Sequence, residues 1–173
     1  MTSDEDGYLI GVEGKDETRV FAKNVVLATG SRPRQFPGVP FDEERILSNE
    51  GALNLKSVPS TLGIIGAGVI GLELGSVWKR LGADVRILEA MPTFLPFADS
   101  AVSREALKAF KQQGVDMEFG VHIDSIKNDG DRVIVQYKDK DGKNSEMWVD
   151  RLIISIGRVP FTAALDAPVV GLK

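Results

Sequence analysis

A glycine pattern in the middle of this 173-residue chain constrains its fold more than any other feature. The segment Gly66–Gly71 has glycine at its first, third and sixth positions. A strand-like apolar run that starts at Thr61 precedes it, and a helix-like run that stops at Gly82 follows it. Glu89 closes the next predicted strand, 18 residues after Gly71. This strand–turn–helix context, with an acidic residue at this spacing, predicts a dinucleotide-binding site.

Each part of the pattern has a mechanical role in the predicted site. Gly66 permits the sharp turn, Gly68 lets a pyrophosphate approach the backbone, and Gly71 brings the helix close to the sheet. The N-terminus of the helix offers N–H groups and a partial positive charge to the pyrophosphate. Glu89 can accept hydrogen bonds from both ribose hydroxyls of adenosine, whereas a 2′-phosphate would meet a like charge. The pattern therefore predicts NAD rather than NADP.

The segments on either side of the glycine pattern alternate between predicted strands and helices. A continuous apolar run over residues 24–28 predicts a strand covered on both faces, and the Pro- and Gly-punctuated segment 33–59 predicts a connector with a short helix around residues 49–53. A helix is expected over residues 100–113, with Val102, Ala106 and Phe110 forming its apolar stripe.

Three alternating runs between residues 121 and 149, separated by turn residues, predict a β-meander. A buried strand at residues 152–156 follows the meander, which therefore takes the place of a helical crossover. The expected fold is a three-layer α/β dinucleotide-binding domain, Rossmann-like, with a parallel sheet and a β-meander crossover.

Composition excludes several kinds of chemistry. The chain has no cysteine and one histidine, His122, so it cannot form a disulfide, a thiolate nucleophile or a Cys-based zinc site. We predict His122 to be a surface or packed residue rather than a catalytic one. The net charge of −4 gives no electrostatic signature of nucleic-acid binding. No apolar run reaches about 18 residues, and no signal peptide is expected, which predicts an intracellular protein without a membrane partner.

Three segments together carry a family resemblance. They are residues 26–33, the string from Gly66 to Ala83, and Ile156–Gly157–Arg158. They resemble the flavin-dependent pyridine nucleotide-disulfide oxidoreductases and, within that family, the dihydrolipoyl dehydrogenases, which reoxidise lipoamide in 2-oxoacid dehydrogenase complexes. The resemblance covers essentially the whole chain but only the middle of such an enzyme.

The resemblance implies roles for individual residues. Thr29, Gly30 and Ser31 would contact the ADP part of FAD. Ile123 would lie on the adenine side of NAD, and Gly157 would approach its nicotinamide end. The remaining NAD-binding residues would be those of the glycine pattern and its surroundings, namely Gly66, Ala67, Gly68, Val69, Ile70, Gly71, Leu72, Glu73 and Glu89. For Glu73, which we place in the first turn of the helix, a favourable interaction with the helix dipole is an equally good explanation.

The resemblance also implies a domain organisation. Residues 1–57 would end the first half of an FAD domain and form a connector, residues 58–157 would form the NAD-binding domain, and residues 158–173 would return to the FAD domain. The family's redox cysteine pair, His–Glu base and N-terminal FAD motif are absent from the sequence. We therefore expect a fragment that binds NAD weakly and does not turn over lipoamide, and we assign no catalytic and no metal-binding residue.

The parent enzyme would be a homodimer that uses FAD and NAD and associates with 2-oxoacid dehydrogenase complexes, in the bacterial cytoplasm or the mitochondrial matrix. Its remaining FAD and interface domains would be the other partners of this segment. Two alternatives stay open. The same architecture serves NADH oxidases and mercuric reductases, and the chain could also be a non-catalytic nucleotide-binding module.

Overall fold

The computed structural model describes residues 2–4, 6–12, 14, 18–163, 165 and 171, and these fall into two compact units. One unit runs from Pro33 to Arg158, and the other is made from residues 1–32 and 159–173. The predicted boundary at residues 57 and 58 concerns the domains of a parent enzyme and stays a prediction. Most of the predicted return segment after Ala163 lies outside the described residues.

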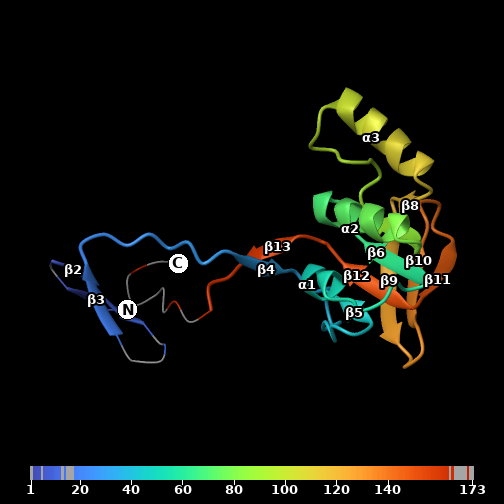
Figure 1. Ribbon diagram of the computed structural model, residues 1–173. Coiled ribbons are helices and arrows are strands. Elements are labelled where there is room, and N and C mark those ends of the chain that lie inside the picture. Colours follow the sequence, from blue (N-terminus) through green and yellow to red (C-terminus); the bar gives the residue numbers. More distant parts are fainter. Residues whose placement is uncertain are drawn as a thin grey trace. The chain divides into compact units, whose positions relative to one another are not determined.

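The Pro33–Arg158 unit is built on a five-stranded parallel sheet with the strand order β5-β12-β6-β7-β8 (Figure 1). Its strands are β5 (Ile46–Leu47), β6 (Thr61–Ile65), β7 (Asp84–Glu89), β8 (Asp116–Phe119) and β12 (Arg151–Ile154). Its helices are α1 (Asn49–Leu53), α2 (Val69–Arg80) and α3 (Ser100–Gln112). The β-meander forms a separate antiparallel sheet of β9 (His122–Asn128), β10 (Val133–Lys138) and β11 (Asn144–Val149).

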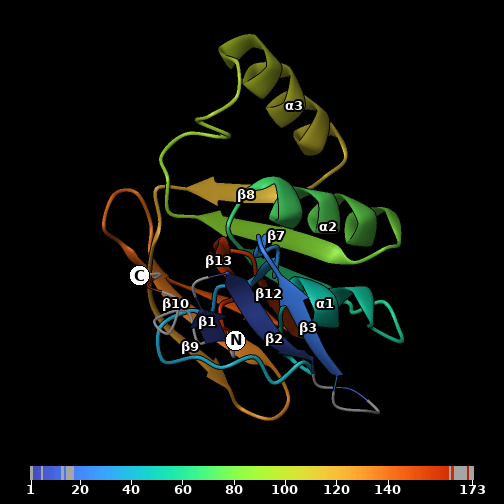
Figure 2. The same cartoon turned by 90° about the vertical axis from the view of Figure 1, so that its left-hand side faces the viewer.

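Two apolar cores cover the two faces of the parallel sheet. Helix α2 lies on one face and the meander on the other (Figures 1 and 2), and side chains of α1 and α3 pack against the helix-side core. Successive residues of β12 point to alternate faces, so Ile153 packs in the helix-side core, whereas Leu152 and Ile154 pack in the meander-side core. This arrangement confirms the predicted three layers and the meander crossover.

A glycine within β6 allows the meander to pack closely on the sheet. A Cβ atom at Gly63 would lie 2.7 Å from Met147 Cε and 2.9 Å from Leu152 Cδ1. Both distances are below those that real Cβ atoms show, so a larger residue would displace these core side chains. The neighbouring residues Leu62 and Ile64 face the helix side and are fully buried.

The segment before β6 differs from its prediction. Residues 33–59 were expected to form a connector outside the core, and this expectation is wrong for β5, because Ile46 and Leu47 are buried and extend the parallel sheet beyond β12. A strand of two residues between prolines and charged residues has no periodicity that a sequence pattern can reveal. The short helix expected around residues 49–53 is confirmed as α1, capped by Ser48.

A carboxylate organises the turn that leads into β5. The Oδ1 atom of Asp42 accepts hydrogen bonds from the backbone N–H groups of Glu44, Arg45 and Ile46 at 2.7–2.9 Å, and its Oδ2 atom accepts one from Asn128. Partial burial by itself would raise the pKa of this carboxyl, but the four hydrogen bonds together hold the pKa below its ordinary value of 3.8.

The Asp42 turn carries a prediction about pH. Because the folded-state pKa is lowered, its contribution to stability is present above pH 3.8 and is lost as the pH falls through the folded-state pKa. Urea unfolding of the wild-type protein and of Asp42→Asn should differ by up to about 1 kcal/mol at pH 7, since Asp42 is largely exposed and its charge is screened. The difference should shrink below pH 3.8, and a difference that grows on acidification would contradict this account.

The other unit contains a three-stranded antiparallel sheet of β1 (Thr2–Asp4), β2 (Gly7–Val12) and β3 (Thr18–Ala22). The predicted strand over residues 24–28 is wrong, because these residues form no strand and Val26 is 88% exposed. An apolar run forms a buried strand only where neighbouring strands pair with it, and no strand in the described part of the chain does so. The short strands β4 (Ser31–Pro33) and β13 (Arg158–Pro160) pair with each other.

Candidate nucleotide-binding cleft

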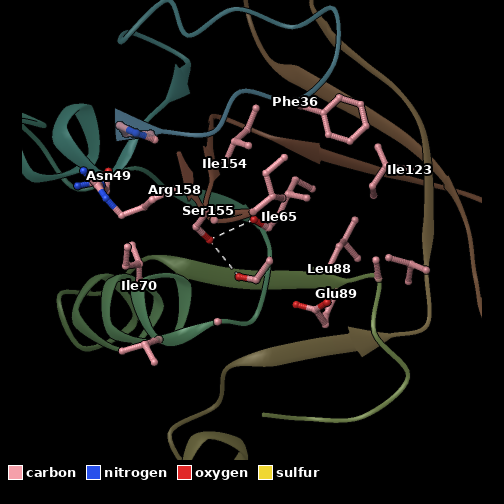
Figure 3. A pocket seen from close by; sticks show the side chains of 18 of the residues that line it. Phe36, Asn49, Ile65, Ile70, Leu88, Glu89, Ile123, Ile154, Ser155 and Arg158 are labelled. Carbon is pink, nitrogen blue, oxygen red and sulfur yellow. Dashed lines mark hydrogen bonds between the residues drawn. The ribbon is translucent and has the colours of Figure 1, made fainter. Parts of the chain in front are cut away.

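A cleft of about 650 Å³ lies at the carboxyl ends of β6, β7 and β12 (Figure 3). Ligands of open α/β sheets bind at this edge, and the volume is within the usual range for small-molecule sites. The glycine turn, the start of α2 and the ends of the three strands line the cleft. In Figure 3, Glu89 and Ile123 lie toward one end of the cleft, whereas Asn49 and Arg158 lie toward the other.

The N-terminus of α2 opens into this cleft. Gly68 is the N-cap residue and has no side chain to cap the helix, and a Cβ atom placed on it would have no neighbour within 4 Å. The N–H groups of the first turn and the positive end of the helix dipole are therefore directed at open space. An anion of the size of a pyrophosphate can approach this backbone without displacing a side chain.

The turn into α2 requires glycine at two positions. Gly66 has φ = +103°, a conformation that L-residues rarely adopt, and its N–H donates to the Leu88 carbonyl at 2.8 Å. At Gly71, a Cβ atom would meet Gly66 O and lie 2.6 Å from Ser155 Oγ. The first and third glycines of the pattern thus have the steric roles that the sequence predicts.

Glu89 is the last residue of β7, and its carboxylate binds both the glycine turn after β6 and the loop after β7. Its Oε2 atom accepts a hydrogen bond from Ala67 N at 2.6 Å, and its Oε1 atom accepts one from Met91 N at 2.7 Å. Each carboxylate oxygen has two acceptor sites, so both retain one for a ligand. The carboxylate therefore presents two acceptors to the cleft in a fixed orientation.

The ends of the cleft differ in chemistry. Around Ile123 the lining is apolar and includes Phe36, Leu88 and Val121. At the other end Arg158 Nη1 donates to Asn49 Oδ1 at 3.2 Å, and Gly157 leaves the backbone open with φ = +114°. An apolar surface suits the flat face of an adenine ring, while the opposite end offers a cation and an amide to a polar group.

The structure brings together seven of the predicted site residues and separates others. Those that line the cleft are Gly66, Gly68, Val69, Ile70, Glu89, Ile123 and Gly157. Ala67, Gly71 and Leu72 are buried, and Ala67 and Leu72 pack in the helix-side core. Thr29, Gly30 and Ser31 belong to the other unit, where Phe161 N donates to Gly30 O and Thr29 Oγ1 donates to Phe161 O.

The placement of Glu73 in the first helical turn is wrong. Helix α2 begins at Val69 and has no acidic residue in its first turn, so Glu73 starts the second turn. Its side chain is exposed and is not part of the cleft lining. The exposure of Glu73 follows from helix geometry. Successive residues are 100° apart about the helix axis, and the preceding Leu72 faces the core.

Several lining residues escaped the sequence analysis. Ser155 is held at the end of β12, while Phe36 and Asn49 come from the segment expected to be a connector. His122 lies at the cleft with a side chain that is 78% exposed, 3.8 Å from Asp124, which agrees with a surface histidine. A signal for Ser155 existed, because polar residues at the carboxyl ends of parallel strands gather at one edge of the sheet.

Comparison with known proteins agrees with this geometry. The family model described as pyridine nucleotide-disulphide oxidoreductase matches residues 2–173. The chain belongs to this family. Dihydrolipoyl dehydrogenase from Cupriavidus necator is 49% identical over 96% of the chain, and the mitochondrial enzyme of that name from Schizosaccharomyces pombe is 38% identical over 94%.

A solved structure is also similar in fold. The HOCl-induced flavoprotein disulfide reductase RclA from Escherichia coli, solved as a Cu(II) complex, superposes with a TM-score of 0.79 at 29% identity, over 95% of this chain and 37% of that one. The chain spans about a third of the length of the curated relatives, 35% of the Cupriavidus protein and 32% of the Schizosaccharomyces protein. The family therefore accounts for the cleft, while the activity of a whole enzyme is a separate question.

Proposed function

We propose that the cleft binds NAD(H) and that the chain is the pyridine-nucleotide-binding part of a dihydrolipoyl dehydrogenase. The observation that carries the proposal is the uncapped N-terminus of α2 at Gly68, with the Glu89 carboxylate fixed beside it. The identity of 49% with a dihydrolipoyl dehydrogenase supports this member of the family. NADH oxidases and mercuric reductases share the architecture, and nothing in the cleft favours them.

The described residues fit NAD along the whole cleft. The adenine would lie against Ile123 and its apolar neighbours, and Glu89 would accept hydrogen bonds from the adenosine ribose. The pyrophosphate would meet the N–H groups that follow Gly68, and the nicotinamide end would lie near Gly157 and Arg158. A 2′-phosphate would be placed against the Glu89 carboxylate, which disfavours NADP.

The proposed whole enzyme needs groups beyond this chain. Thr29, Gly30 and Ser31 would contribute to binding FAD, which would supply two-electron redox chemistry between a redox disulfide and NAD. The chain has no cysteine, so its own residues would bind and orient the nucleotide rather than supply the redox disulfide. By itself the chain should show no lipoamide turnover.

The setting of the whole enzyme is part of the proposal. We propose that it is a homodimer associated with a 2-oxoacid dehydrogenase complex, in the bacterial cytoplasm or the mitochondrial matrix; one relative is bacterial and another is named as mitochondrial. No helix among the described residues is long and apolar enough to span a membrane.

Nucleotide titration of the full chain tests the proposal. NADH, followed by its fluorescence, should bind at least tenfold more tightly than NADPH. Glu89→Ala should weaken NADH binding about tenfold or more, because charge-assisted hydrogen bonds contribute roughly 1.5–3 kcal/mol. Glu105→Ala removes an exposed glutamate of α3 and should have no effect. Equal binding of the two nucleotides, or none at millimolar concentrations, would contradict the proposal.

A further inference from the structure

A serine that the proposed function does not use lies under the glycine turn. Ser155 follows β12, whose residues pair with β6 in parallel. Its hydroxyl lies 3.1 Å from Ile65 O and 3.0 Å from Gly66 O, and its backbone N–H donates to Ile65 O at 2.8 Å (Figure 3). Ile65 O therefore accepts a hydrogen bond from the backbone of Ser155 as well as from its hydroxyl. Gly66 O is bonded by the hydroxyl of Ser155 and not by its backbone N–H.

The Gly66 carbonyl and the Ala67 N–H belong to one planar peptide group. Ser155 Oγ donates to the oxygen of this group, and Glu89 Oε2 accepts from its N–H at 2.6 Å. Two side chains, one just after β12 and one at the end of β7, therefore hold opposite edges of the same peptide plane. We call this arrangement of Ser155, Glu89 and the Gly66–Ala67 peptide the peptide clamp.

The orientation of this peptide affects the cleft directly. Rotation of the plane would change ψ of Gly66 and φ of Ala67, and with them the direction in which Gly68 and the start of α2 enter the cleft. The Gly66 carbonyl and Ser155 Oγ lie against Gly71, in the space that a Cβ atom at this position would occupy. This close contact already limits rotation of the Gly66–Ala67 peptide. The hydroxyl adds a directional restraint to this steric one.

The peptide clamp is compatible with a bound nucleotide. Both Glu89 oxygens keep an acceptor site after bonding Ala67 N and Met91 N, so ribose hydroxyls can bind without breaking the clamp. The turn is then ordered before the ligand arrives, and no free energy of binding is spent on ordering it.

We propose that Ser155 is a positioning residue for the pyridine nucleotide, acting through the Gly66–Ala67 peptide rather than by contact with the ligand. This inference rests on the proposed function, because the clamp matters only if the N-terminus of α2 receives a pyrophosphate. It assigns a role to a residue outside the glycine pattern, contributed by the strand that follows the meander.

The test compares Ser155→Ala with Ser103→Ala in the full chain. Ser103 is a matched control, because its partly buried hydroxyl also donates to a backbone carbonyl, that of Leu95, at 3.1 Å and outside the cleft. Ser155→Ala should weaken NADH binding about fivefold, the usual net effect of one lost hydrogen bond, with an unchanged NADH-to-NADPH preference. Ser155→Cys, whose thiol is a weak donor, should fall between wild type and Ser155→Ala. Ser103→Ala should leave NADH binding unchanged.

Amide hydrogen exchange separates positioning from general destabilisation. In the protein without nucleotide, the Ala67 amide should exchange faster in Ser155→Ala than in wild type, while amides of the sheet such as that of Ile153 should not change. An unchanged Ala67 amide, a uniform acceleration across the sheet, or unchanged NADH affinity would each overturn the proposal. If wild type fails to bind NADH, the proposed function fails, and with it the positioning role, even where Ala67 exchange still shows the clamp.

Discussion

Replacing Gly71 by alanine should lower the free energy of unfolding by about 3 kcal/mol and abolish nucleotide binding. The added Cβ would meet the Gly66 carbonyl oxygen and lie 2.6 Å from Ser155 Oγ. Backbone atoms cannot move aside as the end of a side chain can, so the helix must shift away from the turn, at a cost typical of severe overpacking. That shift also carries the N-terminus of α2 away from the cleft.

Gly75→Ala is the matched control for this prediction. Gly75 lies one turn further along α2, and its Cβ would be 3.2 Å from Ile64 Cδ1 and from Ile87 Cδ1. These are movable side-chain ends, and alanine is favoured over glycine inside a helix by about 1 kcal/mol, so the net change should stay within about 1 kcal/mol. Urea unfolding followed by circular dichroism measures both variants. Equal effects of the two substitutions would show that the Gly71 contact is not the critical one.

The glycine turn and its neighbours could be predicted because their signals are local. The turn needs glycine within a few residues, Gly82 and Gly114 end the helices with positive φ, and Glu89 follows at a fixed spacing. Trp78 is buried within the helix-side core for a similar reason, since helical periodicity places it on one face of α2. Conformational requirements of this kind depend on adjacent residues, so a short segment of sequence is enough to predict them.

Predictions that depended on distant partners were less reliable. The apolar run at residues 24–28 predicts a strand, but Val26 is almost fully exposed because no described strand pairs with it. The α3 stripe was only partly right, since Val102 is 60% exposed whereas Ala106, Leu107 and Phe110 pack on the core. Hydrophobic pattern indicates which face can be buried, while the surrounding chain decides whether anything covers it.

The candidate site divides in the same way. The residues that one continuous segment supplies, such as Gly66 and Gly68, could be predicted from that segment alone. Asn49 and Ser155 meet at the cleft because β12 lies between β5 and β6. The position of Ser155 after a predicted strand is visible in the sequence, but this strand order cannot be deduced from one sequence. Periodicity also could not decide the start of α2, and an error of one residue there is enough to move Glu73 from the first turn to the second.

Replacing Gly68 by alanine should weaken NADH binding about a hundredfold while leaving the fold intact. Gly68 has φ = −75° and ψ = 177°, an extended conformation that alanine adopts without strain, and its Cβ would find no protein atom within 4 Å. The space it would enter is the cleft, at the point where the pyrophosphate must approach the backbone. Alanine is a poorer N-cap residue than glycine, so the loss of binding should come with a loss of stability of at most about 1 kcal/mol.

Gly11→Ala supplies the matched comparison, because its added methyl group also meets nothing within 4 Å but lies in β2, outside the cleft. NADH titration and urea unfolding of both variants separate the two effects: Gly68→Ala should change mainly the affinity, and Gly11→Ala should change neither substantially. Together with Gly71→Ala, which should lose both affinity and stability, Gly68→Ala distinguishes a glycine that makes room for a ligand from one that makes room for the protein itself. Undiminished NADH binding by Gly68→Ala would mean that the pyrophosphate does not lie at the N-terminus of α2, and the proposed orientation of NAD in the cleft would have to be abandoned.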